Sequence, residues 1–307
     1  MTDSTPGSGQ PGSGQPGSGQ LGPIACVTVT ASDLMAVEAC YTGFLDYRVV
    51  GRGRVGAELA GHWKAPGVAD SRYLLLGPEA GNECVFRFIE TNADPAYVPF
   101  STYGWNAAEI MVRDVDAMAE RLADSPFEII GVPQNLSFTD NIRAMQILGP
   151  GKELLYLTEF KQPIPGLDTP VARCDVDSTF IVILGGPSMD GLQGFYNENF
   201  GVPNAPVMDS RVKGMSAAFG NSPEHKYPIA ALPLNGQNLI EVDEMPADAT
   251  TRPTPDGSLP AGIAIVSIVS QLNGGRQVGS DEPPYTGASG STCRTGPAGE
   301  LLEIIYR

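Results

Sequence analysis

The feature that most constrains this chain is an internal repeat of one strand, one helix and three strands. In its first occurrence, CVTVT (26–30) alternates apolar and polar residues as a half-buried strand does. Ser32 and Asp33 then form a helix N-cap signal, and an amphipathic helix is expected to end near Gly43–Phe44. The runs YRVV, SRYLLLG and NECVFRFIE supply the three further strands. A repeat of this kind predicts a fold assembled from equivalent units.

The same order returns three more times. The second occurrence begins at WNAAEIMV, has a helix opened by Asp114 or Asp116, and ends with two strands around a Gly-Pro-Gly turn in AMQILGPGKELLYLTEF. The third begins at STFIVILGG, and GMSAAFG, PIAALPL and NLIEVDEM are its candidate strands. The fourth runs from AGIAIVSIVS to GELLEIIYR, and its Gly- and Ser-rich middle gives only a weak helix signal. We therefore predict four units, of which the last is degenerate.

Shifts in composition divide the chain further. The sequence PGSGQ occurs three times in residues 6–20, and because it has nothing apolar to pack, residues 1–23 are predicted to be a disordered tail. Three prolines mark residues 161–176 as a linker. We therefore expect a first domain at 24–160 and a second at 177–307, each made of two neighbouring units.

Composition also limits the partners. The formal net charge of −16 repels a phosphate backbone, so nucleic acid is not expected as a partner. No apolar run approaches the roughly 20 residues that span a bilayer, and no signal peptide is seen, so no membrane partner is expected. The five cysteines are scattered without a CxxC pair, which favours free thiols and a cytoplasmic location.

Several stretches resemble the vicinal oxygen chelate superfamily, the group of glyoxalases, bleomycin-resistance proteins and extradiol dioxygenases. They are VTASDLMAVEACYTGFLDYRVV, RDVDAMAERL and GFYNENFGV for strand-helix segments, and GPGKELLYL, GQNLIEV and GPAGELLEI for closing strands. The resemblance covers roughly residues 24–307. It implies an α+β fold in which four βαβββ units pair into two consecutive domains, each a curled mixed sheet around a cavity.

In that family the metal ligands, usually His, Gln or Glu, lie on the first and closing strands of each unit. The resemblance places these positions, unit by unit, at Cys26 and Arg87, Ala107 and Tyr156, Thr179 and Glu241, and Gly262 and Glu303. Only the two glutamates are ordinary ligands of a hard metal. Neither histidine of the chain, His62 or His225, occupies such a position, so dioxygenase and metal-dependent glyoxalase chemistry are disfavoured.

Glu241 and Glu303 are expected to lie close together in the cavity of the second domain. With water in the remaining positions, they would hold Mg²⁺ or Mn²⁺. The alternative is a remnant pair that binds no metal, so the expected cofactor is a divalent metal or none. Without a metal, repulsion between the two carboxylates should make one of them hold its proton more tightly.

The first domain offers a second constellation. Strand alternation directs Arg87, Glu109 and Tyr156 inward, where Arg87 is predicted to hold a substrate oxygen, Glu109 to act as base and Tyr156 as proton donor. The alternative is a buried Arg87–Glu109 ion pair that only satisfies itself. The residues expected to contact substrate are Cys26, Thr28, Thr158 and Thr179.

Two other side chains have competing interpretations. Cys26 is expected to be a buried core residue, with a catalytic nucleophile as the disfavoured alternative, because no Cys-His spacing is visible. His62 lies next to Trp63 in GHWKAPG, a segment that reads as a loop. A surface position is expected for His62, and a place at the mouth of a cavity is the alternative.

We expect an enzyme of lyase or isomerase type that acts on a small oxygenated metabolite, with a carbonyl or aromatic group, and whose family metal site is incomplete or absent. The alternative is a protein of the bleomycin-resistance type that binds a small molecule without chemistry. A structural module that dimerises through its sheets is a third reading, and a homodimer is left open.

Overall fold

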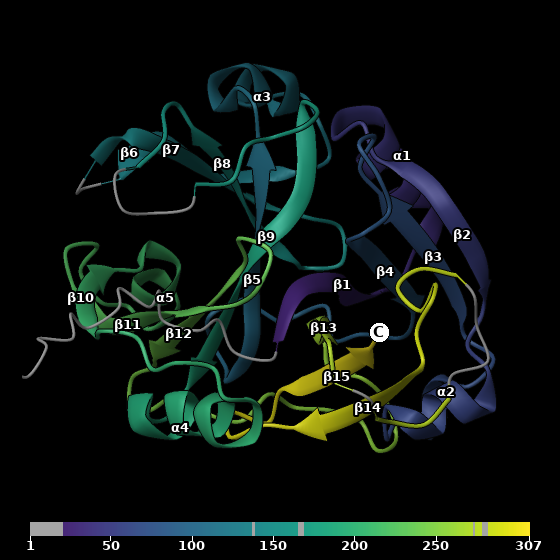
Figure 1. The fold of residues 1–307 in the computed structure, drawn as a ribbon. Coiled ribbons are helices and arrows are strands. Elements are labelled where there is room, and N and C mark those ends of the chain that lie inside the picture. Colours follow the sequence, from purple (N-terminus) through teal and green to yellow (C-terminus); the bar gives the residue numbers. More distant parts are fainter. Residues whose placement is uncertain (1–20, 137–138, 165–168, 273, 278–281) are drawn as a thin grey trace, which may run out of the picture.

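The computed structural model describes residues 21–136, 139–164, 169–272, 274–277 and 282–307. These residues form fifteen strands in two curled mixed sheets, with few helices. Figure 1 shows the purple strand β1 and the yellow strands β14 and β15 on the same side of the molecule, although they come from opposite ends of the sequence. The predicted α+β architecture of βαβββ units is confirmed.

The seven-stranded sheet combines unit one (21–90) with unit four (262–306), in the order β14-β15-β13-β1-β4-β3-β2. Unit one contains β1 (Leu21–Ala31), α1 (Leu34–Phe44), β2 (Arg48–Arg54), α2 (Ala57–His62), the 3₁₀ helix η1 (Pro66–Val68), β3 (Arg72–Gly77) and β4 (Val85–Glu90). Unit four contains β13 (Gly262–Ser270), β14 (Gly290–Thr295) and β15 (Leu301–Tyr306). The described part of unit four contains no helix, in keeping with its degenerate sequence.

The eight-stranded sheet combines unit two (104–160) with unit three (176–244), in the order β10-β11-β12-β9-β5-β8-β7-β6. Unit two contains β5 (Gly104–Val112), α3 (Val115–Leu122), β6 (Glu128–Leu136), β7 (Thr139–Leu148) and β8 (Leu154–Phe160). Unit three contains β9 (Val176–Gly186), α4 (Met189–Phe200), β10 (Met208–Arg211), α5 (Lys213–Ala218), β11 (Lys226–Pro233) and β12 (Leu239–Glu244).

The pairing of units corrects the expectation that sequence neighbours share a sheet within 24–160 and 177–307. The antiparallel neighbours are β1 with β13 and β5 with β9. Alternation specifies which face of a strand is buried, but it does not specify which first strand lies beside which. Because β5 and β9 are already paired with each other across the linker, β1 and β13 are the two first strands left, and their edges pair with each other.

Two similar turns tie the sheets together. GPGKE (149–153) and GPAGE (296–300) each end in a buried glutamate. Glu153 accepts a hydrogen bond of 2.9 Å from the hydroxyl of Tyr41 in unit one, and Glu300 accepts one of 3.3 Å from Tyr196 in unit three. These contacts join unit one to two and unit three to four. Together with the sheets they link the four units into a closed ring.

The largest core lies between the two sheets. It takes Val27 and Val29 from β1, and Ala108 and Ile110 from β5. Helices α1, α3 and α4 pack on the sheets and contribute to the same core, as the periodicity of their apolar residues predicts. By alternation, the residues between these core positions face the opposite, concave side of each sheet. The candidate sites therefore lie on the two concave faces.

The predicted starts of the helices are largely confirmed. Asp33 caps α1 and Asp114 caps α3 through hydrogen bonds to backbone N–H groups. Most of GMSAAFG, which was expected to be the second strand of unit three, belongs to helix α5. The second strand of this unit is β10, which precedes that helix. A short run of small residues fits either period, so the sequence could not distinguish them. Among the described residues, every helix is too short or too polar to cross a bilayer.

The predicted disordered tail, 1–23, lies mostly outside the described residues. Its last three residues are an exception, because β1 begins at Leu21. Leu21 is fully buried and its carbonyl accepts a hydrogen bond from the backbone N–H of Asn235. The boundary of the ordered chain is therefore earlier than the composition indicated, because a single leucine after the repeats can anchor the strand.

Candidate functional site

A cavity of about 300 Å³ lies on the concave face of the seven-stranded sheet. Helix α2 and the segment before β14 form its walls, and β3 and β4 form its floor. Its lining residues are Arg54, Gly56, Glu58, Leu59, His62, Trp63, Tyr73, Leu75, Arg87, Arg276, Gln277, Glu282, Pro283 and Tyr285. This volume suits a small metabolite.

Arg87 of β4 forms the centre of the floor and is only 3% exposed. Its guanidinium group lies over the Trp63 ring, 4.3 Å from the centroid, in a cation–π contact. Its Nε donates to Thr28 Oγ1 at 3.0 Å, and its Nη1 donates to the Tyr285 hydroxyl at 2.9 Å. A third, longer contact of 3.4 Å reaches Glu303 Oε2. The buried cation is thus held from three elements.

Glu303 of β15 is fully buried beside it. Its Oε1 accepts hydrogen bonds from Trp63 Nε1 at 3.0 Å and from the Tyr285 hydroxyl at 2.8 Å, and its Oε2 accepts one from Ser267 at 2.6 Å. Burial raises the pKa of Glu303, but the Arg87 charge and these three donors lower it below its ordinary value. Glu303 is therefore ionised, and both of its oxygens accept hydrogen bonds.

His62, the last residue of α2, connects this pair to the cavity. Its Nε2 lies 2.9 Å from Ser291 Oγ and 3.6 Å from Glu303 Oε1. Burial lowers the pKa of His62 and outweighs the opposite effect of the Glu303 charge. The imidazole is therefore neutral near pH 7. Nε2 faces Ser291 and Glu303, and a proton on this nitrogen leaves Nδ1 as the basic nitrogen.

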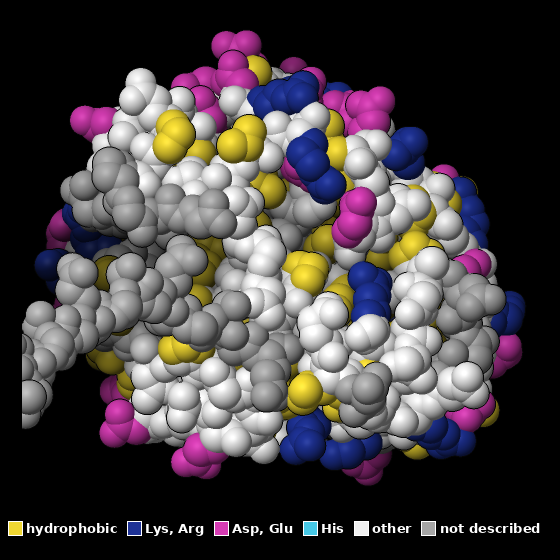
Figure 2. Space-filling view, in the orientation of Figure 1, with side chains coloured by type: hydrophobic (Ala, Val, Ile, Leu, Met, Phe, Trp, Pro, Cys, Tyr) yellow, Lys and Arg dark blue, Asp and Glu magenta, His cyan; other side chains and the backbone are white. Residues whose placement is uncertain are grey.

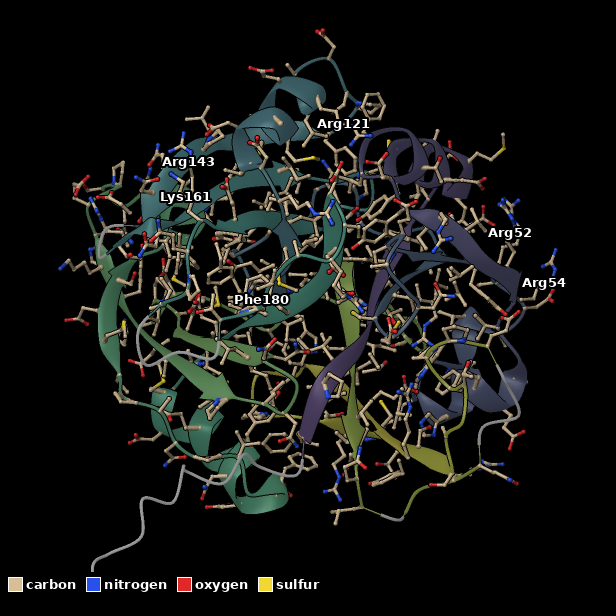
Figure 3. The ribbon with its side chains drawn as sticks, turned by 45° about the horizontal axis from the view of Figure 1, so that its top comes forward. Arg52, Arg54, Arg121, Arg143, Lys161 and Phe180 are labelled. Atoms are coloured by element: carbon tan, nitrogen blue, oxygen red, sulfur yellow. The ribbon has the colours of Figure 1, made fainter. Side chains whose placement is uncertain are left out.

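Three arginines lie around this cavity even though the chain is strongly acidic. Arg54 and Arg276 accompany Arg87 in its lining. Figure 3 shows Arg54 on the outside of the molecule, where its side chain is exposed. Figure 2 shows acidic and basic side chains interspersed around the outline of one face of the molecule. The lining is of mixed charge, because it also holds Glu58 and Glu282, and the arginines pair with carboxylates: Arg87 with Glu303, Arg276 with Glu58 and Arg54 with Asp70.

The thiols near the cavity are not nucleophiles. Burial raises the pKa of Cys26, and it raises the pKa of Cys293 to about 12. A catalytic cysteine needs the opposite shift, toward the thiolate. Cys26 packs with Leu75 and Val85, which agrees with its expected role as a core residue.

The concave face of the eight-stranded sheet carries a different set. Glu109 of β5 lies beside Tyr156 of β8 and accepts a hydrogen bond from Thr158. Glu241 and Asp243 of β12 lie on the same face, two strands away. Burial raises the pKa of Glu109 to about 8 and that of Glu241 to about 7. This second face is acidic.

The structure separates residues that the sequence analysis had grouped. Arg87, Cys26 and Thr28 lie on the first concave face, whereas Glu109, Tyr156 and Thr158 lie on the second. The predicted convergence of Arg87, Glu109 and Tyr156 on one cavity is therefore wrong, and the carboxylate partner of Arg87 is Glu303.

Thr179 lies on neither face. It neighbours the thiol of Cys84, because a register shift in the pairing of β5 with β9 interrupts the alternation.

The expected proximity of Glu241 and Glu303 is also wrong. Glu241 belongs to the eight-stranded sheet and Glu303 to the seven-stranded sheet. The error follows from the pairing of units, because unit three meets unit two and unit four meets unit one. The two glutamates therefore cannot share a metal ion or a proton.

The residues do not fit the family's metal. On the first face, the guanidinium of Arg87 lies against the one carboxylate that a metal would need. Ser267, not Gly262, faces Glu303 from the neighbouring first strand. No three His, Cys, Asp or Glu side chains among the described residues are arranged to hold a single metal ion. On this face the guanidinium of Arg87 is the cation beside Glu303.

The sequence analysis missed Trp63, Tyr285 and Ser267, and it favoured a surface position for His62. His62 ends a helix inserted between β2 and β3, Trp63 directly follows it, and Tyr285 comes from the segment before β14. Strand alternation gives no information on inserted segments. The one available signal was the adjacent His-Trp pair in GHWKAPG, since an amphipathic pair of this kind can line the mouth of a cavity.

The two curled sheets of βαβββ units, each with a concave face, define the vicinal oxygen chelate fold, and this chain has that fold. Among solved structures it is similar to glyoxalase I from Zea mays, with a TM-score of 0.60, 14% identity and coverage of 92% of each chain. It is also similar to a putative dioxygenase from Bacillus subtilis, with a TM-score of 0.55 and 13% identity over 92% of this chain and 84% of that one. By sequence, no family model and no curated protein matches.

Proposed function

We propose that the protein binds a small oxygenated metabolite in the cavity of the seven-stranded sheet and catalyses a proton transfer on it, a reaction of lyase or isomerase type. The observation that carries this proposal is the placement of a neutral, oriented histidine and a fixed cation in one cavity. His62 supplies the base and Arg87 the cation.

The proposed chemistry uses ordinary acid–base catalysis. His62 removes a proton from the carbon next to a carbonyl group, and the electron pair moves to the carbonyl oxygen as an enolate. The Arg87 charge stabilises that oxygen. Glu303 and Ser291 orient the imidazole, and the Glu303 charge stabilises the imidazolium that forms. The proton returns to a different atom in an isomerisation, or a leaving group departs in a lyase reaction.

Hydrogen–deuterium exchange tests the proton transfer itself, whichever product the full reaction forms. The protein is incubated in D₂O with a panel of small 2-oxo and 2-hydroxy carboxylates, and loss of the C–H signal is followed by ¹H NMR. His62→Gln is expected to slow exchange by about 10² or more, the usual contribution of a general base. His225→Gln is the matched control, because His225 is the exposed second histidine. Equal exchange by the wild type and His62→Gln would refute the role of His62.

The second candidate function is binding without chemistry. It is favoured by the fact that Arg87 and Glu303 already satisfy each other, as in a structural pair. A carboxylate that binds in the cavity, with binding weakened by Arg276→Gln, but that exchanges no proton would support this function over catalysis.

We also propose that the protein works in the reducing cytoplasm. All five cysteines are described and unpaired, at positions 26, 40, 84, 174 and 293. Reducing compartments preserve such thiols. Mass spectrometry of alkylated protein from its own cells should show five free thiols, and a native disulfide would contradict the assignment.

A further inference from the structure

The concave face of the eight-stranded sheet gathers three acidic side chains. Ile240 and Val242 of β12 belong to the core between the sheets, so alternation turns Glu241 and Asp243 to the concave side. Ala108 and Ile110 of β5 belong to the same core, so Glu109, which lies between them, also faces the concave side. Each acid raises the pKa of the Tyr156 phenol, after the larger effect of burial, which shows that all three lie near that ring.

Asp243 gives a second observation that points to a missing partner. Its side chain is fully buried, and neither carboxyl oxygen has a hydrogen bond. Buried polar atoms are nearly always satisfied, and an exception calls for an ion, a ligand or a proton. Within the described residues, no Lys, Arg or His side chain forms an ion pair with Glu109, Glu241 or Asp243. Without a cation beside them, burial raises the pKa of all three carboxyl groups, and a bound cation would favour their ionised form.

The surroundings of the acids favour an organic cation over a bare metal ion. No three acidic side chains of the described chain are arranged around a single ion. The strand between β5 and β12 places Ile181 opposite Glu109 and Ile183 opposite Glu241. Ile183 continues into an apolar cluster with Phe100, Met215 and Tyr227. An occupant must therefore present positive charge to the carboxylates and an apolar body to the floor.

Solvent reaches this face. Glu109, Tyr156, Ile181 and Glu241 are all half-buried, not enclosed. We propose that the concave face of the eight-stranded sheet is a binding site for a small amphipathic amine, with its ammonium group held by Glu241, the buried Asp243 adding negative charge behind it, and its apolar body on Ile181 and Ile183. The aromatic ring of Tyr156 adds a cation–π surface. This site is separate from the cavity around His62 and does not depend on the function proposed for it.

Isothermal titration of the full chain with phenethylamine tests the site, with phenylacetate as the probe of similar shape and opposite charge. Phenethylamine is expected to bind one equivalent, and phenylacetate to compete poorly. Glu241→Gln should weaken amine binding by about 10- to 100-fold, the usual contribution of a hydrogen bond to a charged group, and Asp243→Asn should weaken it less, because its charge acts from behind Glu241. Glu128→Gln, an exposed acid on β6, is the control and should leave binding within about twofold.

Two results would overturn the proposal. Equal binding of amine and carboxylate would show that the apolar floor alone binds the probes. Binding of Mg²⁺ that is lost in Glu241→Gln, together with no binding of phenethylamine, would show a metal site instead. Because Asp243→Asn could fail to fold, its thermal midpoint is measured alongside, and Glu241→Gln carries the test by itself if it does. His62→Gln should leave amine binding unchanged, which separates this site from the first one.

Discussion

The Arg87–Glu303 pair can be tested by a double-mutant cycle. At an ordinary contact the second substitution lowers stability further, whereas here the second substitution is expected to restore part of the lost stability. Glu303→Gln leaves the Arg87 guanidinium, which is 3% exposed, without its counter-charge. Removal of one partner of a buried ion pair typically costs about 3–5 kcal/mol. Arg87→Met should cost less, about 3 kcal/mol or below, because three neutral donors still solvate Glu303.

The double variant Arg87→Met/Glu303→Gln carries neither charge. We expect it to be more stable than Glu303→Gln alone, by about 1 kcal/mol or more, because the uncompensated cation is gone. Urea unfolding at pH 7 of the wild type and the three variants, analysed with a common m-value, gives the coupling energy. If the two single effects simply add, the two groups do not balance each other, and our account of the floor of the cavity fails.

The pH dependence of the same pair has a defined sign. The folded-state pKa of Glu303 lies below its ordinary value of 4.5, so its stabilising contribution is present above pH 4.5. It is lost as the pH falls through the lower, folded-state pKa. The stability difference between the wild type and Glu303→Gln should therefore narrow in acid. A difference that stays constant down to pH 3 would contradict the assignment of a buried carboxylate.

Single residues elsewhere in the two sheets give three more tests. Because burial raises the folded-state pKa of Glu109 from 4.5 to about 8, this carboxyl group should make wild-type stability fall as the pH rises through this window. Glu109→Gln should show a smaller fall, because Glu241, Glu153 and Glu300 still titrate there, and should be the more stable by a few kcal/mol at pH 8 in urea unfolding. Tyr41→Phe should lower the free energy of unfolding by about 1–3 kcal/mol, because it removes the phenol that donates to the buried Glu153 carboxyl group, whose Oε2 already has no partner. An unchanged urea midpoint would contradict this. Gly262→Ala should lower the thermal midpoint through a cost of about 2 kcal/mol, since φ is +73° and a Cβ would lie 2.4 Å from the Tyr97 ring.

Much of the fold could be predicted because alternation and capping signals specify the strands and helices of each unit locally. The alternation in CVTVT directs Val27 and Val29 to the core, and Asp33 and Asp114 start the helices where the capping signals indicated. The assignment of partner units could not be predicted in this way. A first strand has the same pattern whichever other first strand lies beside it, and contact between β1 and β13 depends on the closure of the whole chain.

The candidate site shows the same limit. Arg87 and Glu303 were recognisable because they interrupt apolar closing strands, and a polar residue in such a strand needs a partner. Their actual partners, Trp63 and Tyr285, come from segments with no strand periodicity. His62 lies next to Trp63 in sequence, but only the docking of α2 on the concave face brings it to Glu303.

The pairing of β1 with β13 has a consequence for how the chain is made. Between Ala31 and Gly262, the facing ends of these strands, the ribosome must add 230 intervening residues. At about 5–20 residues per second, β1 waits on the order of 10 to 50 seconds for its neighbour. The eight-stranded sheet can form meanwhile, because both of its units have already emerged. Until then, the β1 edge, with its apolar side chains, is an open template for strands of other chains, and we expect it to be the point at which nascent chains aggregate or engage a chaperone.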